Sequence, residues 1–354
     1  MADPEITPTL SVSRQSELYA AFAAFGTSVV AFDTFSDTLG ALTSSWRIPA
    51  VRRRLGDELR DRGIEAVIDL MPHIWSPFMT SAIHRAGALY IPVVHDAAAH
   101  PGDRTGWANW LIGRSVADAD LVITLTQAVA QQLLSSGRVA KTKLRTLFLP
   151  DLSYAGRDLE RGLKPGEATR LLFLGRIMKY KGLAMLLDAL DILRQENVPV
   201  QLGVFGEGNI EDSIPRLQQM GAEIVNRWLT SEDIVDALER YDVVVLPYLE
   251  ASQSGVAATA FGAGLPVVAT PVGGLIEQVR DGHNGTLAES CSAADFARAI
   301  SRLLGDTALY ARLNANIAAD REQRSMQRFV TSCVDLVSEA QMGAPRPPEA
   351  AVYI

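Results

Sequence analysis

Residues 242–287 read DVVVLPYLEASQSGVAATAFGAGLPVVATPVGGLIEQVRDGHNGTL. The apolar runs DVVVLP and LPVVAT are rich in β-branched residues and too short for helices, so each predicts a strand buried inside a parallel sheet. Between them, Ser252, Gln253, Ser254 and Gly255 are expected to form the first turn of an Ala-rich helix. Such a turn presents bare backbone N–H groups and the positive end of the helix dipole at the carboxyl edge of the sheet.

After the second run, the segment PVGG (271–274) predicts a tight turn before another helix that opens near Leu275. Two helix N-termini side by side on one sheet edge form an anion site, and phosphate is the natural ligand of such a site. Glu277 falls in the first turn of the second helix. Capping of that helix is the favoured role for its carboxylate, with ligand contact as the alternative.

The whole chain has 354 residues, enough for two domains with full cores. Its net charge of −8 argues against a nucleic-acid-binding surface. Cys291 and Cys333 are too far apart for a metal-ligand spacing. No apolar run approaches the ~20 residues of a membrane span, and the N-terminus lacks the apolar core of a signal peptide. We therefore predict a soluble, cytoplasmic protein.

Strand and helix signals alternate along the chain, which predicts an α/β fold with two doubly wound parallel sheets in tandem. In the first half the strand candidates are SVVAF, AVIDLM, ALYIPVVHD, LVITLT and LRTLFLP. The expected organisation is an N-terminal domain (1–155), a polar linker (156–168), a second domain (169–324), and a C-terminal helix that could cross back to the first domain, with a loosely held tail (325–354). Ligands of paired sheets of this kind bind in the cleft between them.

Four segments of the second half follow one another in a characteristic order. They are LLFLGRIMKYKGLAMLLDAL, VFGEG, NRWLTSEDI and the stretch 242–287. In this region the chain resembles the C-terminal domain of the family-4 (group 1) retaining glycosyltransferases, which have the GT-B fold of two Rossmann-like domains facing a cleft. The resemblance is dense over roughly 168–340 and thin over 66–150. It implies transfer of a sugar from a nucleoside-diphosphate sugar to an acceptor hydroxyl.

The resemblance assigns Arg176, which follows Gly175, and Lys181, which precedes a glycine, to the stabilisation of the departing diphosphate. Two fixed cations aimed at developing negative charge lower the barrier to bond cleavage. Lys179 competes with Lys181 for this role. The alternative is that these are exposed charges in a strand–helix loop.

The resemblance also implies the residues that hold the donor. The backbone at Gly206 is expected to approach the nucleotide, and Arg227 and Trp228 to line the base pocket, although core packing of Trp228 is an equal alternative. The diphosphate is expected to contact residues of the first helix start and of the turn before the second helix: Ser252, Gln253, Ser254, Gly255, Val256, Gly273 and Gly274.

The usual family signature has two glutamates eight residues apart, and this chain departs from it. Their places are Ala251 and Thr259, with Glu250 one residue from the first place. The second glutamate usually binds the donor ribose, so that contact is expected to be weakened or replaced by Thr259 or a neighbour. A subset with a Ser-Gln-Ser-Gly loop shares this feature, which suggests variation rather than decay.

In the N-terminal domain, the resemblance places His95 at the end of a strand, facing the donor sugar. His95, Asp96 and His100 could suggest a metal site, but neighbouring residues on a strand point to opposite faces, so no metal is expected. Asp96 and His73 are candidates for the acceptor side, with loop packing as the alternative for His73. The glycine-rich loop of most relatives is missing near the start of the chain, where Arg14 is a weak candidate to replace it.

The leading hypothesis is a metal-independent retaining glycosyltransferase of polysaccharide or glycolipid biosynthesis. No cofactor is expected beyond the nucleotide-sugar donor, with UDP or GDP as its nucleotide, and the acceptor would be a saccharide or a lipid-linked molecule. Peripheral contact with the inner membrane face is an open possibility, although Asp and Glu interleave the arginines of VRRRLGDELRDRG. The alternatives are a nucleotide-sugar epimerase of the same fold and a degenerate, non-catalytic binding subunit.

Overall fold

The computed structural model describes residues 8–24, 28–97, 113–152, 162–163, 166–342 and 351–353. The chain divides into two compact units: unit 1 contains Met1–Leu147 and Val330–Ile354, and unit 2 contains Phe148–Phe329. The chain therefore passes between the units twice, after Leu147 and after Phe329. The first crossing precedes the linker expected at 156–168, of which residues 156–161, 164 and 165 lie outside the described residues.

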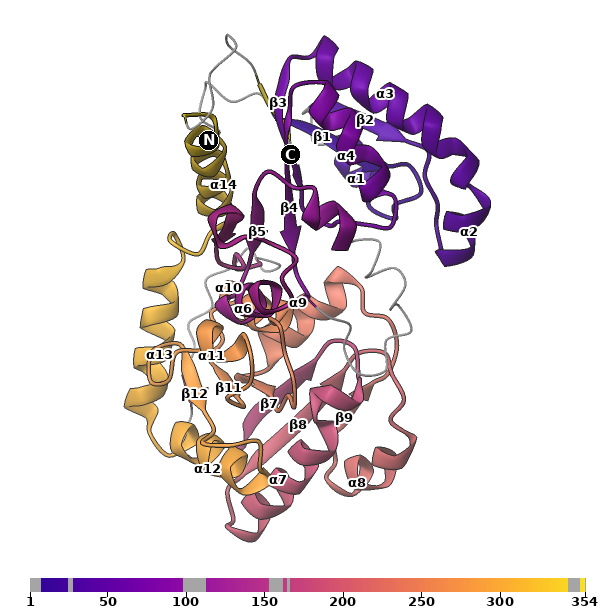
Figure 1. Ribbon diagram of the computed structural model, residues 1–354. Coiled ribbons are helices and arrows are strands. Elements are labelled where there is room, and N and C mark those ends of the chain that lie inside the picture. Colours follow the sequence, from indigo (N-terminus) through magenta and orange to yellow (C-terminus); the bar gives the residue numbers. More distant parts are fainter. Residues whose placement is uncertain are drawn as a thin grey trace. The chain divides into compact units, whose positions relative to one another are not determined.

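Unit 1 is built on a seven-stranded parallel sheet with the order β2-β1-β13-β3-β4-β5-β6 (Figure 1). Its strands are β1 (Thr9–Ser13), β2 (Ser28–Phe32), β3 (Ile64–Asp69), β4 (Leu89–Val94), β5 (Val122–Thr124), β6 (Leu144–Thr146) and β13 (Ala351–Tyr353). Its helices are α1 (Tyr19–Ala24), α2 (Thr38–Thr43), α3 (Ile48–Asp61), α4 (Ser76–Arg85) and α6 (Gln127–Ser135), with the short 3-10 turns η1 (Ser45–Arg47) and η2 (Lys141–Lys143). Residues 113–117 are also helical.

Three details of unit 1 differ from the sequence-based expectation. The tail was expected to be loosely held, but its β13 pairs with both β1 and β3 inside the sheet. β4 ends at Val94, so His95 and Asp96 lie beyond the strand and the alternation of strand faces does not apply to them. β6 covers only the first residues of the predicted LRTLFLP strand. Short apolar segments carry little information about where pairing stops, because the neighbouring strand decides it.

Unit 2 is built on a six-stranded parallel sheet with the order β12-β11-β10-β7-β8-β9. Its strands are β7 (Thr169–Leu174), β8 (Val200–Phe205), β9 (Glu223–Val225), β10 (Val243–Leu246), β11 (Val267–Ala269) and β12 (Gly285–Leu287). Its helices are α7 (Leu183–Gln195), α8 (Ile214–Gln219), α9 (Ser231–Arg240), α10 (Gly255–Gly262), α11 (Leu275–Gln278), α12 (Ala293–Leu304) and α13 (Thr307–Asp320), with the 3-10 turns η3 (Lys179–Lys181) and η4 (Glu211–Ser213). Helix α14 (Met326–Met342) begins in unit 2 and continues in unit 1.

Alternate residues of the unit 2 strands pack into two different clusters, as expected for a sheet that is covered on both faces. Leu171 and Val243 pack with the apolar residues of α7 and α12. Leu172 and Val244 pack with those of α9 and α10. This double burial explains why the strands read as unbroken apolar runs, and it confirms the predicted α/β class with two parallel sheets. No helix in the described parts of the chain is long and apolar enough to cross a membrane.

Candidate functional site

The carboxyl edge of the unit 2 sheet gathers the loops that follow β7, β8, β10 and β11. Arg176 and Lys181 come from the loop after β7, and Ser252 to Ser254 from the loop after β10. Because β7 and β10 are neighbours in the sheet, the two loops meet. The amide of Leu249 donates to the carbonyl of Tyr180 at 2.7 Å, which ties them together.

Two glycines allow the backbones of these loops to touch. Gly182 has φ = +73°, and a Cβ on it would lie 1.8 Å from the carbonyl oxygen of Pro247. Gly273 has φ = +45°, and a Cβ there would lie 1.9 Å from the carbonyl oxygen of Ala251. Both positions require glycine, because a side chain would add left-handed strain to a backbone collision. The loops after β7, β10 and β11 are therefore held as one surface.

Lys181 is anchored by a tyrosine that the sequence analysis did not single out. Its Nζ donates to the phenolic oxygen of Tyr248 at 2.7 Å and lies 4.2 Å from the centre of the tyrosine ring. The ring of Tyr248 is buried, and its hydroxyl also lies 3.5 Å from Oγ of Ser254. Tyr248 therefore connects the loop cation to the start of α10. Its place directly after the strand, in LPY, was the available signal.

The start of α10 differs slightly from the prediction. The helix begins at Gly255, and Ser254 is its N-cap, with Oγ accepting from the amide of Ala257 at 3.2 Å. Gln278 of α11 fixes this cap, because its Oε1 accepts from the amide of Ser254 at 2.7 Å and its Nε2 donates to the carbonyl of Ser254 at 3.1 Å. Gln278 is 5% exposed. A buried glutamine on a one-turn helix gives no sequence signal for this role.

The second predicted helix opens at Leu275 as expected, but it is short. Helix α11 spans only four residues, with Gly274 as its N-cap, so it contributes little dipole of its own. Its turn still approaches the loop after β10, because the amide of Gly274 donates to the carbonyl of Ala251 at 3.0 Å. α10, with eight residues, presents a full N-terminus at this edge.

Among the described residues, no carboxylate pairs with either Arg176 or Lys181. Arg176 is exposed, and within the described residues its side chain has no hydrogen bond or ion pair. Lys181 is half-buried and contacts the neutral phenol of Tyr248. Val256, in the first turn of α10, packs so close to Gly175 that a Cβ on that glycine would lie 3.1 Å from Cγ2 of the valine. Loop and helix start are thus direct neighbours.

The loops after β8 and β9 form the other end of this edge. Asn226 links them, because its Oδ1 accepts from the amide of Gly208 at 3.1 Å and its Nδ2 donates to the carbonyl of Gly208 at 3.0 Å. Gly206 begins the first of these loops, with its amide donating to the carbonyl of Val225. The side chain of Trp228 is 66% exposed, so the alternative that it packs in the core is wrong.

Arg227 is occupied by an acidic partner. Its guanidinium contacts both carboxylate oxygens of Asp233 at 2.5 and 2.7 Å, and this pairing holds the pKa of Asp233 far below its usual range. Asp233 also completes the capping box of α9 with Thr230. The arginine therefore stabilises the start of a helix, and its side chain is less available to a ligand than the sequence analysis expected.

At the two places of the missing glutamate signature, Ala251 and Thr259 are both buried, and only the neighbouring Glu250 is exposed. Glu250 is exposed in the loop after β10. Thr259 lies within α10 and is 6% exposed. A ribose contact at Thr259 would have to reach a nearly enclosed hydroxyl, whereas Glu250 is open to solvent.

In unit 1, His95 and Asp96 line a cavity of about 190 Å³ together with Pro72 and Arg138. Nε2 of His95 lies 2.8 Å from the carbonyl oxygen of Leu70. Because a carbonyl can only accept, this contact requires a proton on Nε2. His100 lies outside the described residues. Within the described part of the chain, no group of three or more His, Cys, Asp and Glu side chains is arranged to hold a metal ion.

His73 belongs to a hydrogen-bonded turn after β3. Its Nδ1 accepts from the amide of Trp75 at 3.0 Å, and its ring meets the edge of Phe35. The residue keeps an exposed edge, but desolvation of the ring lowers the pKa of His73, against the opposing charge of Asp69. The geometry supports the loop-packing alternative, because the neutral Nδ1 is needed within the turn.

Arg14 follows β1 and forms an exposed ion pair with Asp33 at 3.1 Å. This contact joins the ends of β1 and β2. Exposed pairs of this kind contribute little to stability. The guanidinium can therefore exchange this partner for a ligand at small cost, and its candidate role stays a prediction.

Residues 168–306 match the family model described as glycosyl transferases group 1. The chain is 30% identical over 290 residues to a D-inositol 3-phosphate glycosyltransferase of Streptomyces bingchenggensis, an alignment that covers 72% of this chain and 63% of the relative. It is 32% identical over 280 residues to the protein of the same name in Geodermatophilus obscurus, covering 71% and 60%. The chain thus spans about 60% of the length of these relatives.

Solved structures with the same fold include Anabaena HepE in complex with UDP and glucose, with a TM-score of 0.70, 16% identity, and coverage of 94% of this chain and 91% of that one. Sucrose-phosphate synthase from Thermosynechococcus elongatus has a TM-score of 0.67 at 16% identity and covers 95% of this chain and 100% of its own. At these identities the likeness establishes the fold, two Rossmann-like domains as in GT-B glycosyltransferases, and no more.

Proposed function

We propose that this chain, whose residues 168–306 match the group 1 glycosyltransferases, is a retaining glycosyltransferase. It transfers a sugar from a nucleoside-diphosphate sugar to an acceptor hydroxyl in polysaccharide or glycolipid biosynthesis. We assign it to the subset with Ser-Gln-Ser-Gly, residues 252–255, in place of the two-glutamate signature.

One observation carries this proposal. Arg176, Lys181 and the start of α10 meet at one sheet edge, and within the described residues neither cation is paired with a carboxylate. Uncompensated positive charge beside the backbone N–H groups of a helix start is an arrangement suited to a diphosphate. Lys181, held by its contact with Tyr248, and the N–H groups of the helix start are fixed before the reaction, so they stabilise the charge that develops on the leaving diphosphate without reorganisation.

The nucleotide would lie toward the loops after β8 and β9. The exposed indole of Trp228 offers a stacking surface for a base, and the loop at Gly206 allows close approach of the backbone. UDP or GDP is the proposed nucleotide, and HepE with bound UDP is a relative in fold. Glu250, exposed in the loop after β10, is the carboxylate we assign to the sugar hydroxyls.

The proposed chemistry needs no protein nucleophile. The acceptor oxygen forms a bond to the anomeric carbon on the face from which the diphosphate departs, and a diphosphate oxygen takes the acceptor proton. His95, whose Nε2 lies 2.8 Å from the carbonyl oxygen of Leu70, is assigned a hydrogen bond to a sugar hydroxyl. Arg14, His73 and Asp96 remain proposals for the acceptor side.

The proposed acceptor is a saccharide or a lipid-linked molecule, and the proposed location is the cytoplasm, with peripheral contact with the inner membrane face. Thermal-shift measurements with a panel of sugar nucleotides would identify the donor. A lipid-linked acceptor would require that the enzyme work on membranes, so transfer to acceptors in vesicles is the measurement that separates it from a soluble saccharide.

The test of the activity is donor turnover by the Arg176→Ala and Lys181→Ala variants. We expect a loss of about 100-fold or more for each, as when a fixed group that stabilises developing charge is removed. Lys179→Ala is the matched control, because Lys179 lies in the same turn and is exposed. Undiminished transfer by the first two variants would overturn their roles. Epimer formation without acceptor would favour the epimerase, and no donor binding would favour a non-catalytic subunit.

A further inference from the structure

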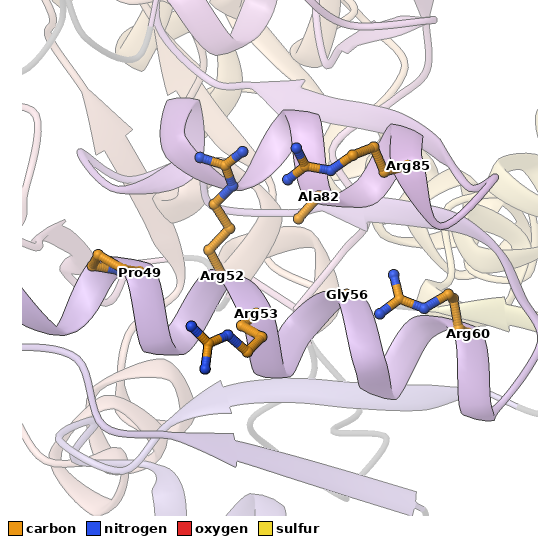
Figure 2. A pocket seen from close by; sticks show the side chains of 7 residues that line it. All are labelled: Pro49, Arg52, Arg53, Gly56, Arg60, Ala82 and Arg85. Atoms are coloured by element: carbon orange, nitrogen blue, oxygen red, sulfur yellow. The ribbon is translucent and has the colours of Figure 1, made fainter.

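The surface between α3 and α4 in unit 1 contains a cavity of about 370 Å³ whose charged lining consists of arginines alone. Arg52, Arg53 and Arg60 come from α3, and Arg85 from α4. Figure 2 shows the guanidinium groups of Arg52 and Arg85 extending toward one another from the two helices. The chain has a net charge of −8, so these arginines form a local concentration of positive charge on an acidic protein.

The spacing along α3 explains how the arginines gather. Arg52, Gly56 and Arg60 are four residues apart and therefore lie on one face of the helix. Gly56 is buried against Ala82 of α4, where an added Cβ would lie 3.8 Å from the alanine Cβ. The small residues bring the helices together, and the longer arginine side chains surround the hollow that remains.

The charges of this cavity are mostly uncompensated. Arg60 pairs with Asp57 at 2.5 Å. The side chains of Arg52, Arg53 and Arg85 have no hydrogen bond or ion pair with any residue that the structure describes. Like charges that converge repel one another unless an anion joins them, and the repulsion is reduced but not removed by salt. The planar fork of a guanidinium matches the oxygens of a phosphate group and binds them in pairs.

We propose that this cavity is a binding site for a phosphate group, separate from the donor site of unit 2. The group is held between Arg52 and Arg85, with Arg53 adding charge at the rim. Two sources carry the same chemistry, a soluble phosphate compound and the phosphodiester headgroup of an anionic lipid. The proposal does not depend on the glycosyltransferase activity, since it uses residues of unit 1 only.

The first arm of the test is calorimetric titration with inorganic phosphate at constant ionic strength. The second is co-sedimentation with phosphatidylcholine vesicles that contain or lack phosphatidylglycerol. Both use the full chain and the single variants Arg52→Gln and Arg85→Gln. Arg312→Gln is the control, because it removes the same charge from an exposed position on α13 of unit 2.

We expect each of the first two variants to weaken binding about tenfold, the effect of losing one charge-assisted interaction, and Arg312→Gln to leave it unchanged. Phosphate binding must also persist in Arg176→Gln, which removes a cation of the proposed donor site. If Arg52→Gln and Arg85→Gln weaken binding to vesicles only, the ligand is the lipid headgroup. If they weaken the binding of inorganic phosphate in solution, the ligand is a soluble phosphate compound. Absence of binding in both arms, or binding that survives Arg52→Gln and Arg85→Gln, would overturn the proposal.

Discussion

Nζ of Lys181 lies 2.7 Å from the phenolic oxygen of Tyr248, whose hydroxyl in turn lies 3.5 Å from Oγ of the helix cap Ser254. A loop cation, a buried tyrosine and the first residue before α10 are thus connected in one chain of contacts. The contact with Tyr248 restricts the lysine without neutralising it, because a phenol carries no charge at neutral pH. The ammonium group is therefore held in place while keeping its full attraction for an anion.

Replacement of Tyr248 by Phe should weaken UDP binding about threefold to tenfold while leaving the fold intact. The substitution keeps the buried ring and removes one hydrogen bond, whose net contribution is about 0.5–1.5 kcal/mol. Tyr241→Phe is the matched control, because its hydroxyl donates to Glu223 at 2.9 Å, away from the start of α10. Calorimetric titration with UDP compares the two. Equal loss in both variants would show that the contact with Lys181 has no special role.

Gly182→Ala should reduce both thermal stability and UDP affinity. The new Cβ would collide with the carbonyl oxygen of Pro247, so the loops after β7 and β10 would have to separate. Gly221→Ala is the control, since Gly221 also has a positive φ of 65° but has open space around it. The control should cost only the left-handed strain, about 1–2 kcal/mol. If the two variants melt at the same temperature, the close approach of the loops is not required.

Asp151 and Arg324 connect the two segments by which the chain enters and leaves unit 2. Nε of the arginine donates to both carboxylate oxygens at 2.9 and 3.1 Å, and the guanidinium lies over the ring of Phe261 in α10. Arg324→Met should destabilise unit 2 by about 3–5 kcal/mol at neutral pH, because it leaves a buried carboxylate without its partner.

The pH dependence of this variant follows from burial of the carboxyl group. Desolvation raises the pKa of Asp151 even in the presence of Arg324, and loss of the arginine should raise it further. The folded variant would then bind a proton more readily than the unfolded chain, so its stability should recover as the pH falls through the raised pKa of Asp151 toward the ordinary carboxyl pKa of the unfolded chain. Melting curves of both proteins over this range test the sign, and a gap that widens on acidification would contradict it.

The two cysteines should differ in reactivity. Cys333 is buried in α14, and burial raises the pKa of its thiol to about 12. Cys291 is exposed. Since the thiolate is the reactive form, one thiol per chain should react with an alkylating reagent in the native protein and two after unfolding. Peptide mapping should place the native label on Cys291, and early labelling of Cys333 would show that α14 opens readily.

The sequence was sufficient to predict the fold class because burial on both faces leaves a strong pattern. Strands such as β10 had to be apolar throughout, and the loop after β7 stood out through its glycine and basic residues. The loop of Arg176 and Lys181 lies beside the start of α10, and the roles of both residues remain proposals.

The details that the sequence did not predict depend on contacts between distant segments. Tyr248 and Gln278 fix Lys181 and Ser254 through single hydrogen bonds, and no periodicity identifies such partners. The pairing of β13 between β1 and β3 joins residues from opposite ends of the chain. The end of β4 at Val94 is set by the sheet around it, which is why His95 lies in a loop rather than on the strand.

The central claim is that the carboxyl edge of unit 2 binds a nucleoside diphosphate through Arg176, Lys181 and the start of α10. Its most direct test is calorimetric titration of the wild-type chain and the Arg176→Ala/Lys181→Ala variant with UDP and GDP. We predict saturable one-to-one binding of at least one nucleotide by the wild type, and affinity at least about 100-fold lower in the variant, from the loss of two charge-assisted interactions. Equal affinity in both proteins, or no binding of either nucleotide to the wild type, would contradict it.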